Sequence, residues 1–360
     1  MGLIGPARLR PRGGLYPLPL AAGLCLLALA GAMALAAPPT LRATALLAGA
    51  LVEGVLAAAQ IPLLQADLAR AVRGPSLAAA NSAMEFAAGT GALAGPVLAG
   101  LALAGPGLAS TLAGCALVMT MAAPAVAAWQ GRVGAPPAPA APARPRAADG
   151  VRTAVPYVRR DAFLRTALAT RTVNNVLWPV VTVALPLLVA RRWHAGALAY
   201  GFLLAARGLG SIGGTALAAR LGPQALARAY FAAWLVEAAA FVGLALSPLY
   251  PPAVACMALA GIASPLVHVA LDSRIGRAVA DEARGAVFGL QRMAMSAAGL
   301  AGSLGAGGAI AFLPVGPVLA GAGVAMAACA LGGYAVASRH GGLAPDPLSS
   351  AAAAGRGLRR

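Results

Sequence analysis

The sequence predicts an all-α integral membrane protein, a bundle of about ten transmembrane helices. Two observations predict this class. Hydrophobic residues make up 60% of the 360-residue chain and charged residues only 10%, far below the quarter that is usual in soluble domains. The 27 basic residues are all Arg, and most of them fall in alternate gaps between long apolar runs. This composition disfavours a soluble core.

Ten apolar runs provide the predicted helices. They cover residues 15–36, 41–63, 77–104, 107–129, 165–190, 195–219, 225–247, 251–271, 286–312 and 315–337. A helix rises about 1.5 Å per residue, so each run has the roughly 20 residues needed to cross a hydrocarbon layer about 30 Å thick. The first run follows three Arg, as a secretory signal does, but it is longer than a signal core and nine spans follow. We therefore expect an uncleaved first helix, with a signal peptide as the alternative.

The distribution of Arg predicts the topology. Of the 27 Arg, 21 lie in one set of alternate gaps, three in the other set and three within runs. The positive-inside rule places the Arg-rich gaps in the cytoplasm, so both termini are cytoplasmic and the number of spans is even. The net charge of +17 is ascribed to anionic lipid headgroups rather than nucleic acid, because the Arg are scattered over loops without interleaved aromatic residues.

No enzyme, metal or cofactor site is expected. Four cysteines lie singly in four different runs and are interpreted as packing residues: Cys25, Cys115, Cys256 and Cys329. Gly208, Gly210 and Gly213 form a G-x-G-x-x-G pattern, but it lies within an apolar helix rather than after a strand, so a nucleotide site is rejected. The chain contains no Lys, so it cannot form the Lys-containing loop that binds ATP phosphates. No sequence motif brings together a nucleophile, a base and an orienting group, so an enzyme is not expected.

The runs form an internal repeat with an offset of about 210 residues. The last four runs overlie the first four, and the loops agree as well. GLIGPARLRP at 2–11 matches GTALAARLGP at 214–223, and the Arg-Ala-Val triplet at 70–72 matches that at 277–279. Two parallel homologous halves of four and six helices are therefore expected, a pattern found in transporters. The first two spans of the second half have no counterpart, so the first half is expected to lack its opening hairpin.

The predicted halves cover residues 1–130 and 161–338. Residues 131–160 are rich in Pro, Arg and Ala and are expected to form a flexible cytoplasmic linker that ends in a short amphipathic segment. Residues 339–360 are expected to form a disordered cytoplasmic tail.

This architecture resembles the major facilitator superfamily. The resemblance is carried by QADLARAVRGPSLAAANSAMEFAAGTGALAGPVLAG at 65–100, YVRRDAFLRTAL at 157–168, AYGFLLAARGLGSIGG at 199–214 and DEARGAVFGLQRM at 281–293. It covers about residues 2–338 and is most similar to the bacterial efflux branch of enterobactin exporters and macrolide efflux proteins. The resemblance implies a major-facilitator-type bundle in the bacterial inner membrane, with the ten runs as helices 3 to 12 of twelve.

Ionisable and polar residues within spans are candidates for coupling, because a charge there costs a few kcal/mol or more. Glu53 lies midway along 41–63, which the resemblance makes a cavity-lining helix, and Gln60 lies two turns on, on much the same face. A carboxyl group in an apolar span suits the carriage of a proton. A structural hydrogen bond to a neighbouring helix is the alternative interpretation.

Two further spans carry polar candidates. Arg207 lies at the centre of 195–219, and its expected partner is Glu237 or Glu85; an interhelical ion pair is favoured over contact with substrate. A second set shares one face of 165–190 and is predicted to line the substrate path: Arg171, Asn174, Asn175 and Trp178. Snorkelling of the first of these toward the membrane surface is the alternative.

A last group is predicted to serve packing or gating. Glu85 and Arg292 lie near the cytoplasmic starts of their spans and are interpreted as such a pair. Arg220 lies in the loop that the repeat aligns with the N-terminal Arg. Five residues resemble the glycine-proline motif in the fifth helix of drug antiporters of this superfamily, with a generic packing seam as the alternative: Gly89, Gly91, Gly95, Pro96 and Gly100.

The sequence therefore predicts a secondary transporter, an antiporter that exports a small amphipathic or hydrophobic solute, drug-like or siderophore-like, against protons by alternating access. The expected partners are membrane lipids, a small-molecule substrate and the proton as coupling ion, without nucleic acid. Two alternatives stay open. One is a truncated or degenerate relative without transport activity, and the other is a lipid or lysophospholipid flippase of the same fold.

Overall fold

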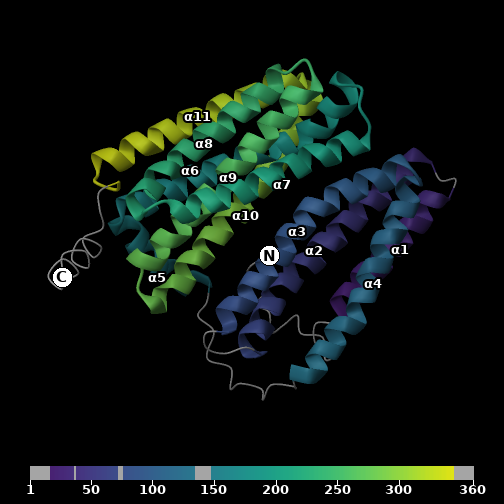
Figure 1. Cartoon of the computed structure of the whole chain (residues 1–360), viewed down its shortest axis with the longest axis horizontal. Helices are drawn as coiled ribbons and strands as arrows, with labels where there is room; N and C mark the ends of the chain where they lie inside the picture. Colours follow the sequence, from purple (N-terminus) through teal and green to yellow (C-terminus); the bar gives the residue numbers. More distant parts are fainter. Residues whose placement is uncertain (1–16, 36–37, 72–75, 134–146, 344–360) are drawn as a thin grey trace. The chain divides into compact units, whose positions relative to one another are not determined.

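The computed structural model describes residues 17–35, 38–71, 76–133 and 147–343. Within these ranges the chain is helical and contains no β-strand. The chain divides into two compact units, Met1–Arg144 and Pro145–Arg360 (Figure 1). The N-terminal Arg, the middle of the predicted linker and most of the predicted tail lie outside the described residues.

Unit 1 contains four long helices within the described residues: α1 (Pro17–Ala34), α2 (Pro39–Ala71), α3 (Ser76–Ala104) and α4 (Gly107–Val133). Helix α1 packs against α4 and α2, and α3 packs against α4. The α1–α4 contact is close because Gly23 has no side chain; a Cβ there would collide with the Thr120 hydroxyl of α4. The turn between α3 and α4 ends at Gly107, whose φ of +86° is a conformation that glycine adopts without steric cost.

Unit 2 contains six long helices and one short one within the described residues. They are α5 (Ala147–Arg160), α6 (Ala162–Leu187), α7 (Ala197–Arg220), α8 (Pro223–Leu246), α9 (Tyr250–Ala278), α10 (Asp281–Phe312) and α11 (Val315–Arg339). A π-helical turn, η1 (Leu188–Arg192), extends α6. Helix α9 packs between α7 and α8, α11 packs against α8 and α6, and α10 packs against α6 and the short α5 (Figure 1).

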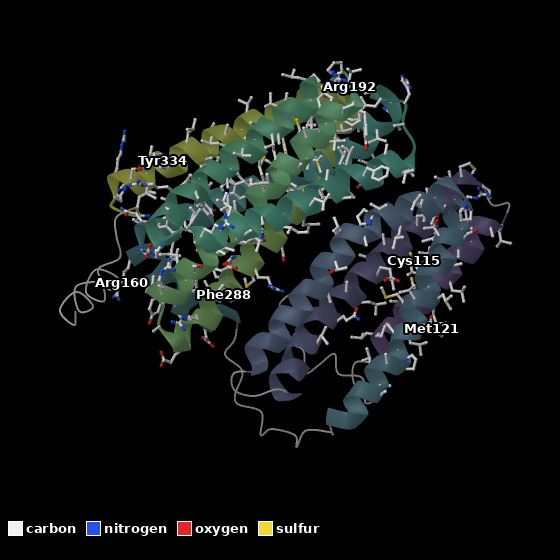
Figure 2. All side chains as sticks on the ribbon, in the orientation of Figure 1. Cys115, Met121, Arg160, Arg192, Phe288 and Tyr334 are labelled. Atoms are coloured by element: carbon white, nitrogen blue, oxygen red, sulfur yellow. The ribbon has the colours of Figure 1, made fainter. Side chains whose placement is uncertain are left out.

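The ends of the helices in unit 2 follow from local chemistry. Asp161 caps α6, because its carboxylate accepts a hydrogen bond of 2.9 Å from the backbone nitrogen of Leu164. Helices α8 and α9 both begin with Pro in the first turn, where the missing N–H has no intrahelical partner to lose. Helix α9 ends where Arg284 donates to the backbone carbonyls of Val279 and Gly276. Arg160 and Arg192 lie at opposite ends of this unit (Figure 2).

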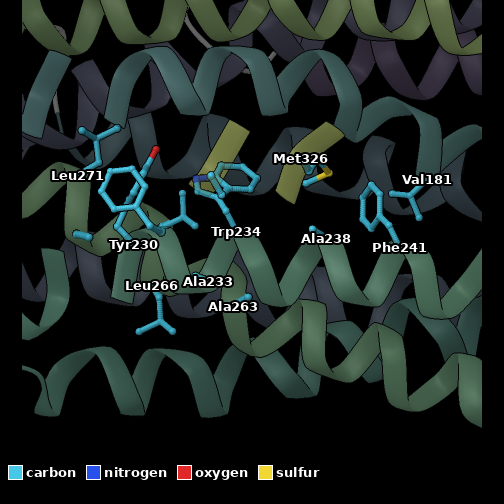
Figure 3. Close-up of a cluster of buried hydrophobic side chains, with 14 of the residues drawn as sticks. Val181, Tyr230, Ala233, Trp234, Ala238, Phe241, Ala263, Leu266, Leu271 and Met326 are labelled. Atoms are coloured by element: carbon cyan, nitrogen blue, oxygen red, sulfur yellow. The ribbon is translucent and has the colours of Figure 1, made fainter. Parts of the chain in front are cut away.

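An aromatic row on α8 fills the core of unit 2. Tyr230, Trp234 and Phe241 project from this helix, and Tyr230 and Phe241 are almost fully buried (Figure 3). The Tyr230 hydroxyl donates a hydrogen bond of 2.7 Å to the carbonyl of Ala167 on α6. The rings of Phe241 and Trp178 of α6 lie 5.5 Å apart. Both contacts join residues 63 positions apart, so α6 and α8 lie parallel in one register.

Glycine permits the closest contact in unit 2, between α7 and α9. A Cβ at Gly210 would collide with the carbonyl of Ala258, and a Cβ at Gly261 would collide with the carbonyl of Arg207. Small residues let the two backbones touch, which is the usual way to pack helices tightly within a membrane. The G-x-G-x-x-G pattern is thus explained in part by packing, although a Cβ at its third glycine, Gly213, would meet no described atom within 4 Å.

Nine helices of the described part are long and apolar enough to cross a membrane. They correspond to nine of the predicted runs; the remaining run forms α3, whose apolar stretch is Leu93–Ala104. Large apolar side chains such as Leu209, Leu300 and Phe312 are exposed, which suits contact with lipid rather than water. The predicted fold class, an all-α membrane bundle of about ten spans in halves of four and six, is confirmed.

Candidate substrate and coupling site

A charged pair lies midway along the helices of unit 2. Arg207 Nη2 of α7 is 3.5 Å from Glu237 Oε1 of α8, and the Glu237 side chain is buried. The Arg207 guanidinium also lies over the ring of Trp178 on α6, 4.3 Å from its centroid. Of the two partners considered from the sequence, Glu237 is therefore the one that Arg207 contacts. Three helices meet at this guanidinium, which is held by charge on one side and by an aromatic face on the other.

The polar face predicted on α6 divides into different environments. Arg171 and Asn174 are buried, with 5% and 0% of their surface exposed. Asn175 instead donates a hydrogen bond of 2.7 Å from Nδ2 to the Met295 carbonyl on α10. Trp178 contacts Arg207, as described above. Arg171 is surrounded by packed helices, so the structure does not favour snorkelling toward the membrane surface as its role.

Several buried polar atoms near this face lack a partner. Arg171 Nη1 and both amide atoms of Asn174 make no hydrogen bond to a described residue, and Trp234 Nε1 makes none of normal geometry. The parallel register of α6 and α8 places Arg171 at the level of Trp234, and Asn174 at the level of Glu237. Native proteins pair most buried polar groups, so unpaired atoms at one level of two neighbouring helices mark a place where a ligand or water completes the hydrogen bonding.

Helix α9 adds two titratable groups that polar patterning in the sequence did not select. His268 and Asp272 are exposed and lie one turn apart on this helix. The His268 imidazole Nδ1 is 2.8 Å from the Ser264 carbonyl. His268 also lies within electrostatic range of Arg171, Asp272 and Arg207. His268 near the end of the run 251–271 and Asp272 just beyond it, at helical spacing, were the signal that could have identified this pair.

In unit 1, Glu53 is the central candidate. Its side chain is half-buried midway along α2, and Oε1 is buried without a hydrogen-bond partner. The Cys25 thiol of α1 is its polar neighbour. Gln60 is half-buried on the same helix. The side chain of Glu85 lies outside the described residues.

The predicted packing and gating residues have varied surroundings. Gly91 and Gly95 are exposed on α3, and a Cβ at either would meet no described atom within 4 Å. Among the described residues, therefore, neither glycine is needed for a close helix contact. Pro96 is half-buried and Gly100 is buried. The last two candidates, Arg220 at the end of α7 and Arg292 on α10, are both exposed.

The described residues contain no group of three or more His, Cys, Asp or Glu side chains placed to hold a metal ion. The four cysteines are free thiols.

Comparison with known proteins identifies the family. The sequence profile of a family described as transmembrane secretion effector matches residues 19–349 and so spans both units. The crystal structure of the nucleoside transporter NupG, in a mutant form, is similar with a TM-score of 0.61. That likeness covers 89% of this chain and 83% of the other at 11% sequence identity, so it concerns the fold alone. No curated protein matches the sequence. The chain belongs to the transmembrane secretion effector family of major facilitator superfamily transporters.

Proposed function

We propose that this transporter is an antiporter that exports a small amphipathic or hydrophobic solute in exchange for protons, by alternating access of its two halves. The observation that carries the proposal is the charged layer of unit 2, where Arg171, Arg207 and Glu237 lie deep within otherwise apolar spans. Charges at that depth are costly, and in membrane proteins they mark the paths of substrates and protons.

The direction of transport is inferred from the family, a group of transmembrane secretion effectors. NupG is a nucleoside transporter, but at 11% identity the likeness to it supports only the fold. The few polar groups in the spans, next to Trp178 and Phe241, favour a cargo with a substantial apolar part. We also propose that the protein lies in the bacterial inner membrane with both termini in the cytoplasm, as the Arg distribution predicts.

Glu53 is the proposed proton carrier. An apolar environment favours the neutral form of a carboxylic acid, so a half-buried carboxyl group can bind a proton on one side of the membrane and release it on the other. The unpartnered Oε1 supports this role, because no strong donor holds that oxygen in its charged form. Glu237 differs, since Arg207 stabilises its carboxylate. We assign Glu237 to the ion pair that positions Arg207.

The test uses purified protein in liposomes with an imposed pH gradient. Three fluorescent probes cover the possible charges of the cargo: ethidium as a cation, N-phenyl-1-naphthylamine as a neutral molecule and 8-anilinonaphthalene-1-sulfonate as an anion. We expect the gradient to accelerate movement of at least one probe relative to empty liposomes. Failure of all three with folded protein would count against transport of such solutes and favour the non-transporting alternative.

The coupling role is tested with Glu53→Gln, which keeps size and polarity but cannot carry a proton. We expect this variant to lose the response to the pH gradient while probe exchange without a gradient continues. The matched control is Glu282→Gln, an identical substitution at an exposed acid near the start of α10. A Glu53→Gln variant with undiminished proton-driven movement would refute the assignment.

A further inference from the structure

We infer that Arg171 and Asn174 bind an anionic group of the cargo, a carboxylate, sulfonate or phosphate, so that the transported molecule is an amphipathic anion. This inference rests on the proposed transport function and adds the charge of the cargo to it.

The first observation is the incomplete compensation of Arg171. A guanidinium stays charged at any physiological pH, and one buried to 95% needs an acid or several acceptors nearby. Glu237 is already paired with Arg207, and Asp161 with Arg274 at 2.8 Å. Asp272 is within electrostatic range of Arg171, but no described carboxylate lies within ion-pair distance of it. The charge of Arg171 is therefore open to an external anion.

The second observation is the set of unused donors beside this charge. Asn174 lies one turn along α6 from Arg171, fully buried, and its Nδ2 has no acceptor. Trp234 Nε1, at the level of Arg171 on α8, makes no hydrogen bond of normal geometry to a described residue, and the Tyr230 hydroxyl is its polar neighbour. A buried polar group without a partner is destabilising, and an acceptor supplied by a ligand would offset that cost. The two unused donors, Arg171 Nη1 and Asn174 Nδ2, together with the positive charge of Arg171, suit an anionic oxygen group.

The third observation concerns access from the exposed face of α9. His268 is exposed there and interacts electrostatically with Arg171. On α6 the half-buried Trp178 lies one turn from Asn174, so surface that a ligand can reach begins close to the buried donors. Tyr230 also interacts electrostatically with Arg171, but its hydroxyl already donates a hydrogen bond to the Ala167 carbonyl. The exposed Asp272 repels an anion, but it lies further toward the end of α9 than His268. The favourable contacts for an anion thus gather at Arg171.

An anionic group could belong to a soluble organic acid or to the headgroup of an anionic lipid. Both would use the same donors. The experiment therefore measures binding of a soluble probe and movement of a labelled lipid separately. Binding is measured without transport, so that a failure of the proposed antiport does not count as a failure of the anion site, or the reverse.

The soluble arm uses purified protein in neutral detergent with 1-naphthoate and its uncharged isostere 1-naphthamide. We expect wild-type protein to bind the carboxylate roughly 10- to 100-fold more tightly, as a charge-assisted hydrogen bond implies. Arg171→Gln should remove this preference, and Arg171→Lys should retain part of it. The control Arg228→Gln removes the same charge at an exposed site on α8 and should bind as wild type does.

A second variant keeps the inference testable if Arg171→Gln does not fold. Asn174→Asp would place a carboxylate one turn from Arg171 and supply the missing partner from within the protein. We expect it to raise the thermal midpoint and to weaken naphthoate binding at least about tenfold, since the internal acid competes with the ligand. Unchanged binding in folded Asn174→Asp protein would overturn the assignment.

The lipid arm follows fluorescent phosphatidylglycerol and phosphatidylcholine in liposomes with wild-type and Arg171→Gln protein. Faster movement of phosphatidylglycerol that depends on Arg171, without naphthoate binding, would assign the anion to a lipid. Arg171-dependent naphthoate binding without lipid movement would assign it to a soluble acid. Equal binding of naphthoate and naphthamide, together with equal movement of both lipids, would refute an anion site at Arg171.

Discussion

The α7–α9 contact provides the sharpest structural test, through the substitution Gly210→Ala. A Cβ at Gly210 would collide with the backbone carbonyl of Ala258, where no flexible side chain can move aside. The two helices must therefore separate by roughly 1 Å, a gap that forfeits a quarter to a half of the dispersion energy of each contact. We expect a packing cost of about 1–3 kcal/mol.

The matched control is Gly213→Ala on the same helix, where the added Cβ meets no described atom within 4 Å. Both substitutions gain the same helix propensity, up to about 1 kcal/mol, so their difference isolates the packing cost. For a unit of about 200 residues this difference corresponds to roughly 2–12 °C in the thermal midpoint.

The assay is thermal unfolding in detergent, followed by tryptophan fluorescence. Unit 2 contains Trp178, Trp193 and Trp234, which report on its packing. We expect Gly210→Ala to unfold at a lower temperature than wild type, and Gly213→Ala to unfold at the same temperature or a higher one. Equal midpoints for the two variants would refute the close backbone contact between α7 and α9.

Three further predictions concern charged residues of unit 2. Arg207→Leu should destabilise the protein by about 3 kcal/mol because it leaves Glu237 buried without its cation, and adding Glu237→Leu should recover most of that loss. A double-mutant cycle in thermal unfolding measures this coupling, and additive losses would contradict it. Asp161→Ala removes the cap of α6 and the 2.8 Å ion pair with Arg274, so we expect it to lower the free energy of unfolding by about 1–2 kcal/mol. In the same assay Asp161→Asn should keep part of the cap and lose less stability. Equal losses in the two variants would contradict a capping role. Arg284→Gln should increase amide hydrogen exchange at the end of α9, because the carbonyls of Gly276 and Val279 lose the Arg284 donor. Unchanged exchange there would contradict the capping contact.

Hydropathy and charge predicted the fold to a useful precision. Each of the ten apolar runs corresponds to one long helix, extended by the π-helical turn in the case of α6, and most helix ends differ from the ends of the runs by only a few residues. This works because a membrane span must satisfy its own backbone and cover its length with apolar side chains, and both requirements are local in sequence. The amphipathic segment expected at the end of the linker is the helix α5.

The candidate site was predicted less completely. The sequence selected Arg171, Asn174 and Arg207 because they are polar residues inside apolar runs. It did not select Trp234, whose indole nitrogen is buried without a partner, because an aromatic residue in an apolar span is an ordinary packing residue. It did not select His268 either, although this side chain interacts electrostatically with Arg171, Asp272 and Arg207.

Sequence alone therefore determined where this chain crosses a membrane and which charges lie inside the crossing segments, since those properties depend on consecutive residues. Tertiary structure decided the lateral neighbours. In the structure Arg207 pairs with Glu237, and Gly210 lies against a neighbouring backbone while Gly213 has no described atom near its Cβ position. Arg171 is buried with no described acid at ion-pair distance. Helix faces meet through packing between segments that are distant in the chain, and the residue pattern of one helix does not specify which other helix packs against it.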